Sequence, residues 1–295
     1  MGSIKIRRDK NAVAIFNKDS GSKIRLGIGK YDKATRPELV DIKITDACSY
    51  MCSFCYQGST PDGIHSKLAN MYHIADELKR AKVFEVAIGG GEPTEYPDFL
   101  SVLAYFRSRD IVPNFTTKSA AWVRRNWHHL NRIIGAFAYS ADNVEQLEQA
   151  AKHFKNIPND KINIHCVMGL QDRQNFIKYM YRAKELDLRV TLLGYKTTHR
   201  GAEYEYYKLY DWWIDTIGML AEFDMCPTFS IDTTLAKQYE DKLAKFMPNY
   251  LYHTEEGKFS MYIDAVSMTF GASSYENLDA MMPFDNSWQD NFQRL

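Results

Sequence analysis

The sequence lacks an excess of charge of either sign. Lysine and arginine together number 37 among the 295 residues, aspartate and glutamate also number 37, and the formal net charge at pH 7 is zero. No global field therefore attracts nucleic acid or an anionic membrane, and electrostatic recognition has to be local. The basic and aromatic stretch at 124–129 is accordingly interpreted as a solvated helix face, and no nucleic-acid partner is expected.

Long apolar runs are missing as well. Nowhere do about eighteen apolar residues follow one another, and residues 1–27 contain no apolar run long enough for a signal peptide. We therefore expect a cytoplasmic protein that has no membrane partner.

Cysteine is scarce, with five residues in the chain, but three of them, Cys48, Cys52 and Cys55, lie close together in DACSYMCSFCYQGSTPDG, residues 46–63. Disulfides consume cysteines in pairs and a structural zinc site takes four protein ligands, so the trio fits neither easily. An iron–sulfur cluster with one iron left open fits better. The alternative is a zinc site that His65 or His73 completes.

Short apolar stretches alternate with segments of helical periodicity from residue 39 onward. Six candidate strands can be recognised, at residues 39–45, 83–89, 112–117, 133–140, 161–169 and 189–195. Strand–helix alternation implies parallel strands joined by right-handed crossovers. The fold class is therefore α/β, a partial (β/α)6 barrel over residues 39–205.

Two flanking pieces do not follow this alternation. Residues 1–38 predict a short β-hairpin extension, and residues 206–295 predict a helical and β-hairpin extension. The latter begins with a helix at 206–223 whose aromatic stripe has the spacing of a core-facing surface. Because an incomplete barrel has exposed strand edges, we expect both flanks to cover it.

Chemically capable side chains recur where the predicted strands end. In parallel α/β barrels the reacting groups gather at the carboxyl ends of the strands. The residues expected at this mouth are Cys48, Cys52, Cys55, Gly90, Gly91, Glu92, Thr116, Thr117, Ser140, Asp142, Met168, Gly169, Tyr195, Lys196, His199 and Arg200.

An open iron can chelate an amine and a carboxylate, such as the methionine end of S-adenosylmethionine, and one electron can then break its bond from sulfur to the 5′ carbon. GGGEP at 89–93 lets the backbone approach a bound methionine, because glycine has no Cβ. Glu92 can accept hydrogen bonds from the ligating amine. Ser140 and Asp142 offer partners for ribose, while Met168 offers an apolar wall for adenine.

The spacing CxxxCxxC with Phe54 before the last cysteine, followed one βα unit later by Gly-Gly-Glu-Pro at 90–93, resembles the radical S-adenosylmethionine superfamily over about residues 39–200. The resemblance implies that the three cysteines hold a [4Fe-4S] cluster and that Gly90 to Glu92 bind the methionine moiety, with Phe54 and Pro93 beside them. It also implies that Thr117, Ser140 and Asp142 lie where the family contacts ribose.

The two remaining cysteines, Cys166 and Cys226, are too far apart in sequence to hold a second four-iron cluster. Cys166, near the end of the fifth predicted strand, is a candidate catalytic hydrogen-atom donor, with an ordinary buried thiol as the alternative. Cys226 begins its apolar run and is placed towards the closed end of the barrel.

The loop GYKTTHRGAEYE at 194–205 carries a group of predicted substrate-binding residues, Tyr195, Lys196, His199 and Arg200. The functional interpretation is that they clamp an anionic part of the substrate and close the site around a radical. The alternative is that these charges are solvated or pair with Glu203 and Glu205.

The leading hypothesis is an enzyme that cleaves S-adenosylmethionine to a 5′-deoxyadenosyl radical and abstracts hydrogen from a substrate. Residues 55–63 weakly resemble peptide-modifying, epimerase-like members, which favours a peptide substrate. A nucleoside, nucleotide or other small molecule is the first alternative, and a zinc-stabilised interaction protein is the second. A radical enzyme of this kind also implies an external low-potential electron donor such as flavodoxin or ferredoxin.

Overall fold

The computed structural model describes residues 3–27, 32–205, 210–246, 248, 252–275 and 278–295. A ten-stranded sheet forms its centre, in the order β10-β9-β8-β7-β6-β5-β4-β11-β12-β13. The strands span β4 Leu39–Thr45, β5 Glu85–Gly90, β6 Val112–Thr117, β7 Phe137–Ser140, β8 Ile162–Val167, β9 Val190–Leu193, β10 Phe229–Ile231, β11 Ser260–Asp264, β12 Thr269–Gly271 and β13 Met282–Pro283. From β10 to β11 all neighbours are parallel, and β12 and β13 continue antiparallel.

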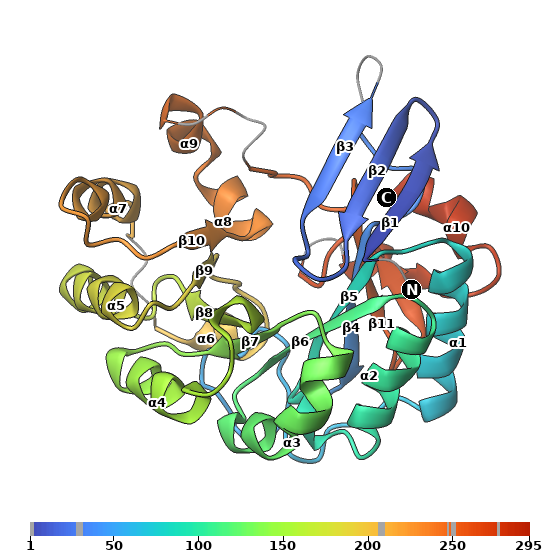
Figure 1. Cartoon of the computed structure of the whole chain (residues 1–295), viewed down its shortest axis with the longest axis horizontal. Coiled ribbons are helices and arrows are strands. Elements are labelled where there is room, and N and C mark those ends of the chain that lie inside the picture. The colour runs from blue at the N-terminus through green and yellow to red at the C-terminus, as the bar shows by residue number, and fades with distance from the viewer. Residues whose placement is uncertain (1–2, 28–31, 206–209, 247, 249–251, 276–277) are drawn as a thin grey trace.

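Helices lie along the outer side of this curved sheet (Figure 1). The longer ones are α1 Leu68–Arg80, α2 Phe99–Ser108, α3 Ala120–Ile133, α4 Val144–Phe154, α5 Arg173–Glu185 and α7 Trp213–Glu222; the shorter ones are α6 Arg200–Glu203, α8 Thr233–Gln238, α9 Glu240–Phe246 and α10 Trp288–Asn291. Single 3-10 turns occur at η1 Pro93–Glu95, η2 Asn159–Lys161, η4 Leu278–Ala280 and η5 Phe292–Arg294. The α/β partial barrel is confirmed, and its six predicted strands are β4 to β9.

The two faces of the barrel strands differ in polarity. In β4 the residues Val40, Ile42 and Ile44 are buried and belong to the main apolar core, whereas the alternate residues Asp41 and Lys43 lie on the opposite face. A parallel strand covered on both faces reads as a continuous apolar run, so the alternation indicates that the inner face meets water or a ligand. The barrel interior is therefore polar and open.

A separate three-stranded antiparallel sheet precedes the barrel, formed by β1 Ile4–Asp9, β2 Ala12–Asn17 and β3 Lys23–Gly27. The sequence predicted a hairpin, and the third strand follows a turn in which Gly21 has a φ of 73°. The Phe16 ring stacks on Phe84 just before β5, with 5.3 Å between centroids. The small sheet thus packs against the amino ends of the barrel strands and pairs with none of them.

The C-terminal flank extends the main sheet at both edges, because β10 pairs with β9 and β11 pairs with β4. Of the predicted helix at 206–223, residues 206–209 lie outside the described residues and the rest contains α7. Tyr210, Trp213 and Leu220 are buried, as the aromatic stripe predicted. No helix within the described ranges combines the length and apolarity needed to cross a bilayer.

Candidate functional site

The three clustered cysteines lie on the loop that follows β4, which we call the cysteine loop, residues 46–60. Cys48, Cys52 and Cys55 are half-buried free thiols. The loop folds back on itself, since Cys48 N donates to Thr60 O at 2.9 Å and Cys55 N donates to Cys52 O at 3.2 Å. Partial burial raises the pKa of the Cys48 thiol. The chain therefore presents three thiols from one compact loop.

Gly90, the last residue of β5, and Gly91 directly after it hold that strand against the cysteine loop. A Cβ added at Gly91 would lie 2.0 Å from Ala47 O. Gly91 N donates to Thr45 O at 2.7 Å, and Gly90 has a φ of 122° that disfavours any side chain. From the sequence we expected these glycines to allow a ligand to approach the backbone. The structure shows that the close approach of the end of β5 to the cysteine loop already requires them.

Glu92 is buried and joins the ends of β5 and β6. Its Oε1 accepts from Thr117 Oγ1 at 2.5 Å and from Thr94 Oγ1 at 2.6 Å, while its Oε2 accepts from Lys118 N at 2.9 Å. Pro93 begins the turn η1 directly after it. The carboxylate charge is thus stabilised by fixed donors at the mouth of the barrel, as the position of Glu92 after a strand predicted.

Lys118, which sequence reasoning missed, forms an ion pair in the same region. Its Nζ lies 2.8 Å from Asp142 Oδ2 and 5.5 Å from the Phe54 ring centroid. Burial opposes the charged form, but the charge and hydrogen bond of Asp142 outweigh it and raise the pKa of Lys118. The other oxygen, Asp142 Oδ1, is buried and has no hydrogen-bond partner in the described part of the chain. The sequence feature that could have identified Lys118 is its position as a cation directly after a predicted strand.

Some of these groups line a cavity of about 970 Å³, whose wall includes Cys52, Phe54, Lys118, Ser140, Asp142 and Tyr204, whereas Cys48, Cys55, Glu92 and Thr117 are not part of its lining. This volume is at the upper end of the range of small-molecule sites. Met168, expected as a wall, is buried in the main apolar core, and Leu170 lines the cavity instead. The fold therefore joins the cysteine loop to the ends of β6 and β7 around one space.

The segment after β9, residues 196–204, packs on the cysteine loop. Arg200 Nε donates to Cys52 O at 3.0 Å and its Nη2 donates to Ser59 O at 2.8 Å. Thr198 Oγ1 donates to Tyr56 O at 2.8 Å. The sequence placed Arg200 towards the substrate, but its guanidinium in the structure binds loop carbonyls 148 and 141 residues away in sequence.

The other predicted substrate residues, Tyr195, Lys196 and His199, each contact a different part of the chain. Tyr195 is buried and its hydroxyl donates to Gly201 O at 2.9 Å, while the His199 ring lies against Gly58. Lys196 Nζ lies 4.5 Å from the Tyr56 ring centroid and 3.3 Å from Ser274 Oγ. The Tyr275 ring lies near the same ammonium group, with its centroid 5.8 Å from Nζ, so two aromatic rings hold Lys196.

Cys166 does not join the other cysteines. It is 1% exposed and shares the helix-facing side of β8 with Ile162 and Ile164, opposite the barrel interior. Its Sγ accepts a hydrogen bond from Gln171 Nε2 at 3.6 Å, and burial raises the pKa of the thiol. The geometry favours the ordinary buried thiol over the hydrogen-atom donor. Cys226 lies before β10, also away from the cysteine loop.

The inner face of the barrel carries titratable groups below the mouth. The carboxyl of Asp41 points into the open interior. Loss of hydration among the surrounding atoms and then the charge of Glu256 raise its pKa to about 7, while its exposed position on β4 keeps the side chain in contact with water, which screens part of both effects. Burial lowers the pKa of His165, on the inner face of β8, to about 4, so its imidazole is neutral at physiological pH.

The histidines that would complete a zinc site have other partners. His65 Nδ1 lies 2.7 Å from Thr45 Oγ1, and the His73 ring packs edge-on against Phe284. Within the described ranges no three His, Cys, Asp or Glu side chains meet around one metal ion. A four-iron cluster needs no such meeting point, because each thiolate binds a different iron. The donor set of three thiols on one loop fits that cluster.

An open α/β barrel whose strand ends hold a three-cysteine loop beside a large cavity defines a class of enzyme that works with a cysteine-bound cofactor. The chain belongs to the radical SAM superfamily, whose family model matches residues 42–195. It is an enzyme, and the cofactors of this superfamily are a [4Fe-4S] cluster and S-adenosylmethionine.

Curated relatives match parts of the chain. Mycofactocin maturase MftC of Mycobacterium ulcerans is 37% identical over 76 residues, which cover 25% of this chain and 21% of the relative. GTP 3',8-cyclase of Edwardsiella ictaluri is 24% identical over 139 residues, which cover 44% of this chain and 40% of the relative. The chain thus spans less than half the length of either relative.

Solved structures share the fold at low sequence identity. Streptococcus suis SuiB bound to precursor peptide SuiA superposes with a TM-score of 0.75 and 15% identity, covering 98% of this chain and 87% of SuiB. Native anSMEcpe with bound AdoMet and Kp18Cys peptide gives a TM-score of 0.60 and 15% identity, covering 87% of this chain and 81% of that one. These similarities support the fold alone.

Proposed function

We propose that this enzyme cleaves S-adenosylmethionine reductively and abstracts a hydrogen atom from a peptide. The observation that carries the proposal is that three free thiols share one loop bordering a cavity of about 970 Å³. Cys48, Cys52 and Cys55 would hold the cluster, leaving one iron for the cofactor's amine and carboxylate. When bound, the cluster supplies the electron that breaks the bond from sulfur to the 5′ carbon.

The chain's own residues would orient the cofactor. Asp142 Oδ1, buried without a partner among the described residues, would accept a ribose hydroxyl, since an unmade buried hydrogen bond is costly. Ser140 borders the same cavity. Glu92 and Thr117 would set the polar edge near the methionine amine, with Gly90, Gly91 and Pro93 fixing the backbone. Met168 does not line this cavity, whereas Phe54 lies on its wall.

A peptide substrate is supported by the relatives. Mycofactocin maturase MftC matches part of the sequence. SuiB, which has a similar fold, was crystallised with precursor peptide SuiA bound. The polar inner face of the barrel suits a polar chain held for hydrogen abstraction, with Lys196 contacting an anionic group. The matched cyclase favours a nucleotide as the second candidate. We also propose an external low-potential electron donor such as flavodoxin or ferredoxin, and a cytoplasmic location, whose reducing conditions keep the thiols free.

The decisive experiment compares the wild type with a triple variant in which Cys48, Cys52 and Cys55 become Ala, after anaerobic reconstitution with iron and sulfide. We expect about four irons per wild-type chain, cluster-dependent 5′-deoxyadenosine, and loss of both in the variant. Cys226→Ala is the matched control and should keep both. Iron retained by the triple variant, or zinc in place of iron in the wild type, contradicts the proposal.

Mass spectrometry of peptides and metabolites from cells with and without the enzyme then decides the substrate class. A mass change confined to a peptide supports the peptide, and one confined to a nucleotide supports the second candidate.

A further inference from the structure

The N-terminal sheet turns its aliphatic side chains towards solvent, whereas an ordinary surface sheet buries them. On β1 and β3 charged residues alternate with aliphatic ones, and on β2 the buried residues Ala12, Ala14 and Phe16 lie on the side of the charged residues, which we call the charged face. The opposite side, which we call the aliphatic face of β1–β3, consists of Ile4, Ile6, Val13, Ile15, Ile24 and Leu26. The strand register aligns Ile6, Ile15 and Ile24 in one row across all three strands. Branched aliphatic side chains therefore form a continuous surface.

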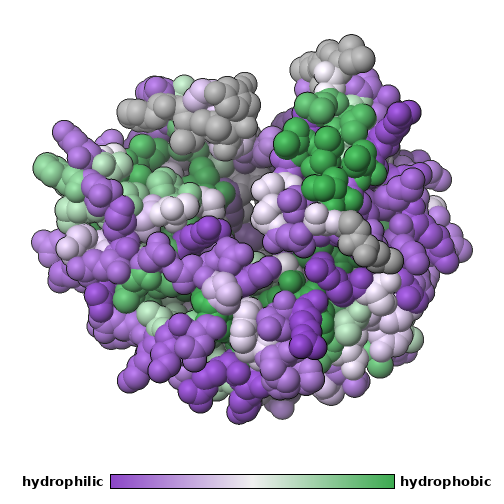
Figure 2. All heavy atoms as spheres, viewed as in Figure 1, coloured by the Kyte–Doolittle hydropathy of each residue, from purple (hydrophilic) through white to green (hydrophobic). Residues whose placement is uncertain are grey.

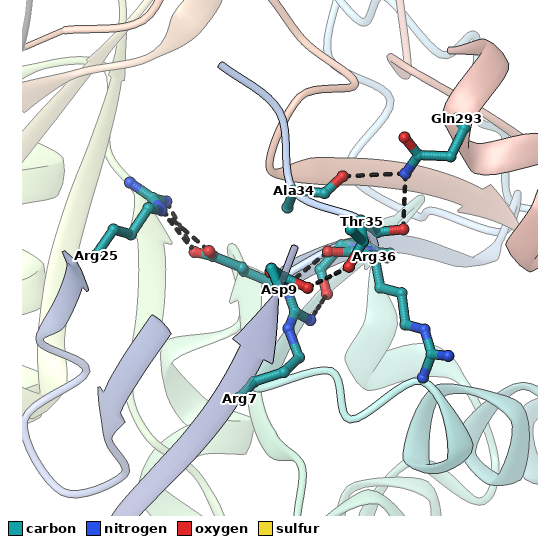
Figure 3. A network of polar contacts seen from close by, with 9 residues as sticks. Arg7, Asp9, Arg25, Ala34, Thr35, Arg36 and Gln293 are labelled. Atoms are coloured by element: carbon teal, nitrogen blue, oxygen red, sulfur yellow. Dashed lines mark hydrogen bonds and ion pairs between the residues drawn. The ribbon is translucent and has the colours of Figure 1, made fainter. Parts of the chain in front are cut away.

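The charged face is the one that docks on the barrel (Figure 3). Arg7 Nη1 donates to Pro37 O at 2.7 Å, and Arg25 makes a bidentate ion pair with buried Glu38, with Nη2 at 2.8 Å from Oε2. Lys5 Nζ donates to Asp110 O at 2.7 Å. These contacts satisfy buried carbonyls and carboxylates at the amino end of the barrel, so the orientation of the sheet is fixed and its aliphatic face must point outward.

The aliphatic face is exposed. Ile4, Ile6, Ile24 and Leu26 have exposed fractions of 50%, 62%, 56% and 58%. Figure 2 shows them as a continuous apolar area over β1–β3. The other exposed large apolar residues of the described chain belong to other elements and loops. Contiguous apolar patches of this kind on a soluble protein mark contact surfaces.

We propose that a second copy of this chain covers the aliphatic face, sheet against sheet, about a two-fold axis. The face presents no charge or hydrogen-bonding side chain at its centre, so its partner must be an equally aliphatic surface, which the chain itself carries. A two-fold interface joins one patch to itself, and twisted sheets pack face to face through aliphatic side chains.

The charges around the face select an antiparallel arrangement. Arg8 and Lys10 lie at one end and Asp19 at the other, all exposed and without a side-chain partner in the described ranges. A two-fold axis in the plane between the sheets and perpendicular to the strands brings the end of the sheet that carries Arg8 to the end that carries Asp19 of the partner subunit. The same operation places Ile6, Ile15 and Ile24 over their own row.

The size of the sheet predicts a reversible contact. Three strands of about six residues span roughly 20 Å by 14 Å, from ordinary strand rise and spacing. The flat footprint of one face is roughly 280 Å². The accessible area of its protruding side chains is larger, so two faces bury at most on the order of 1,000 Å² in total, which is the lower limit for a specific interface. The dimer should therefore dissociate in the micromolar range.

Sedimentation or light scattering of the full chain from about 1 to about 200 µM tests the proposal over the expected dissociation range. We expect the mass to rise from the 34.2 kDa of one chain towards twice that value. Ile6→Glu and Ile24→Glu should each abolish the rise, whereas Ile64→Glu, at a site 68% exposed outside the sheet, should leave it unchanged. These exposed sites tolerate charge, so folding is preserved.

The charge arrangement has its own test. Arg8→Glu should weaken the dimer about tenfold or more and the double change Arg8→Glu with Asp19→Arg should restore it. No recovery overturns the antiparallel arrangement. A monomer at every concentration, or a dimer unaffected by the Ile6 and Ile24 changes, overturns the second copy. If the protein stays a monomer but binds an apolar dye, and Ile24→Glu abolishes dye binding, the face binds a partner other than a second copy, and the proposal is overturned.

Discussion

Arg200 illustrates how a single side chain can acquire a role that its neighbours in sequence do not suggest. Its position in a basic loop indicated contact with an anionic substrate, yet it donates to the carbonyls of Cys52 and Ser59. Hydrogen bonds from a charged donor are worth about 1.5 to 3 kcal/mol each. Arg200 is therefore a positioning residue for the cysteine loop.

Arg200→Gln removes this support, so we expect poorer iron retention and S-adenosylmethionine cleavage at least roughly tenfold slower without substrate. Arg200→Lys should recover part of both, and Arg182→Gln, on the surface of α5, is the control. Iron analysis and 5′-deoxyadenosine formation provide the measurement. If cleavage stayed normal while product formation alone fell, Arg200 would instead contact the substrate.

Asp41 should make stability depend on pH. Because its pKa is raised from 3.8 to about 7, the folded chain holds a proton that the unfolded chain releases between those values. Its stabilising contribution is full below about pH 4 and is lost as pH rises through about 7. Because Asp41 is exposed in the open interior, water screens part of this effect. Asp41→Asn should therefore raise the melting temperature by a modest amount more at pH 8 than at pH 5. Thermal unfolding across that range is the measurement, and an equal effect at both values would contradict the assignment.

Between elements, the contact of β5 with the cysteine loop depends on glycine. In Gly91→Ala the new Cβ would meet Ala47 O, and the backbone of one segment has to move. We expect a loss of about 1 to 3 kcal/mol in the unfolding free energy of the apo chain, as for other overpacked sites, together with lower iron retention. Denaturant unfolding and iron analysis measure the two effects.

Gly89 provides a matched control two residues earlier. A Cβ there meets nothing within 4 Å, so Gly89→Ala should leave stability nearly unchanged. Equal losses in both variants would show that glycine at the end of β5 serves a purpose other than close approach to Ala47.

At the scale of the whole molecule, the N-terminal sheet is joined to the barrel by ion pairs as well as by the apolar cluster of Ala14, Phe16, Phe84 and Val112. Glu38, 1% exposed, accepts from Arg25 through both carboxylate oxygens. Breaking a buried pair leaves one charge uncompensated. Glu38→Gln should destabilise the folded chain by about 2 to 3 kcal/mol.

Equilibrium unfolding in urea measures this loss. Glu148→Gln, which breaks the exposed pair with Arg182, should cost less than about 1 kcal/mol. If Glu38→Gln cost no more than this control, apolar contacts such as Phe16 with Phe84 would be the main link between the sheet and the barrel.

The sequence by itself determined the features that depend on neighbouring residues. Short apolar stretches separated by segments of helical periodicity predicted β4 to β9, and side chains on a strand alternate between its two faces. The spacing of Cys48, Cys52 and Cys55 predicted a three-thiol loop. The same alternation also placed Cys166 with Ile162 and Ile164 on the buried face, a signal available in the sequence that was outweighed by its nearness to the strand end.

Tertiary structure decided which distant segments meet. The pair of Lys118 with Asp142, the contact of Arg200 with the cysteine loop and the outward direction of the aliphatic face each depend on residues brought together by crossovers and packing. A pattern with a period of two specifies that the faces of β1–β3 differ, but not which one is buried. The buried carbonyls and carboxylates at the amino end of the barrel need hydrogen-bond donors, which Lys5, Arg7 and Arg25 on the charged face supply. That face therefore lies against the barrel, and the aliphatic face lies outside.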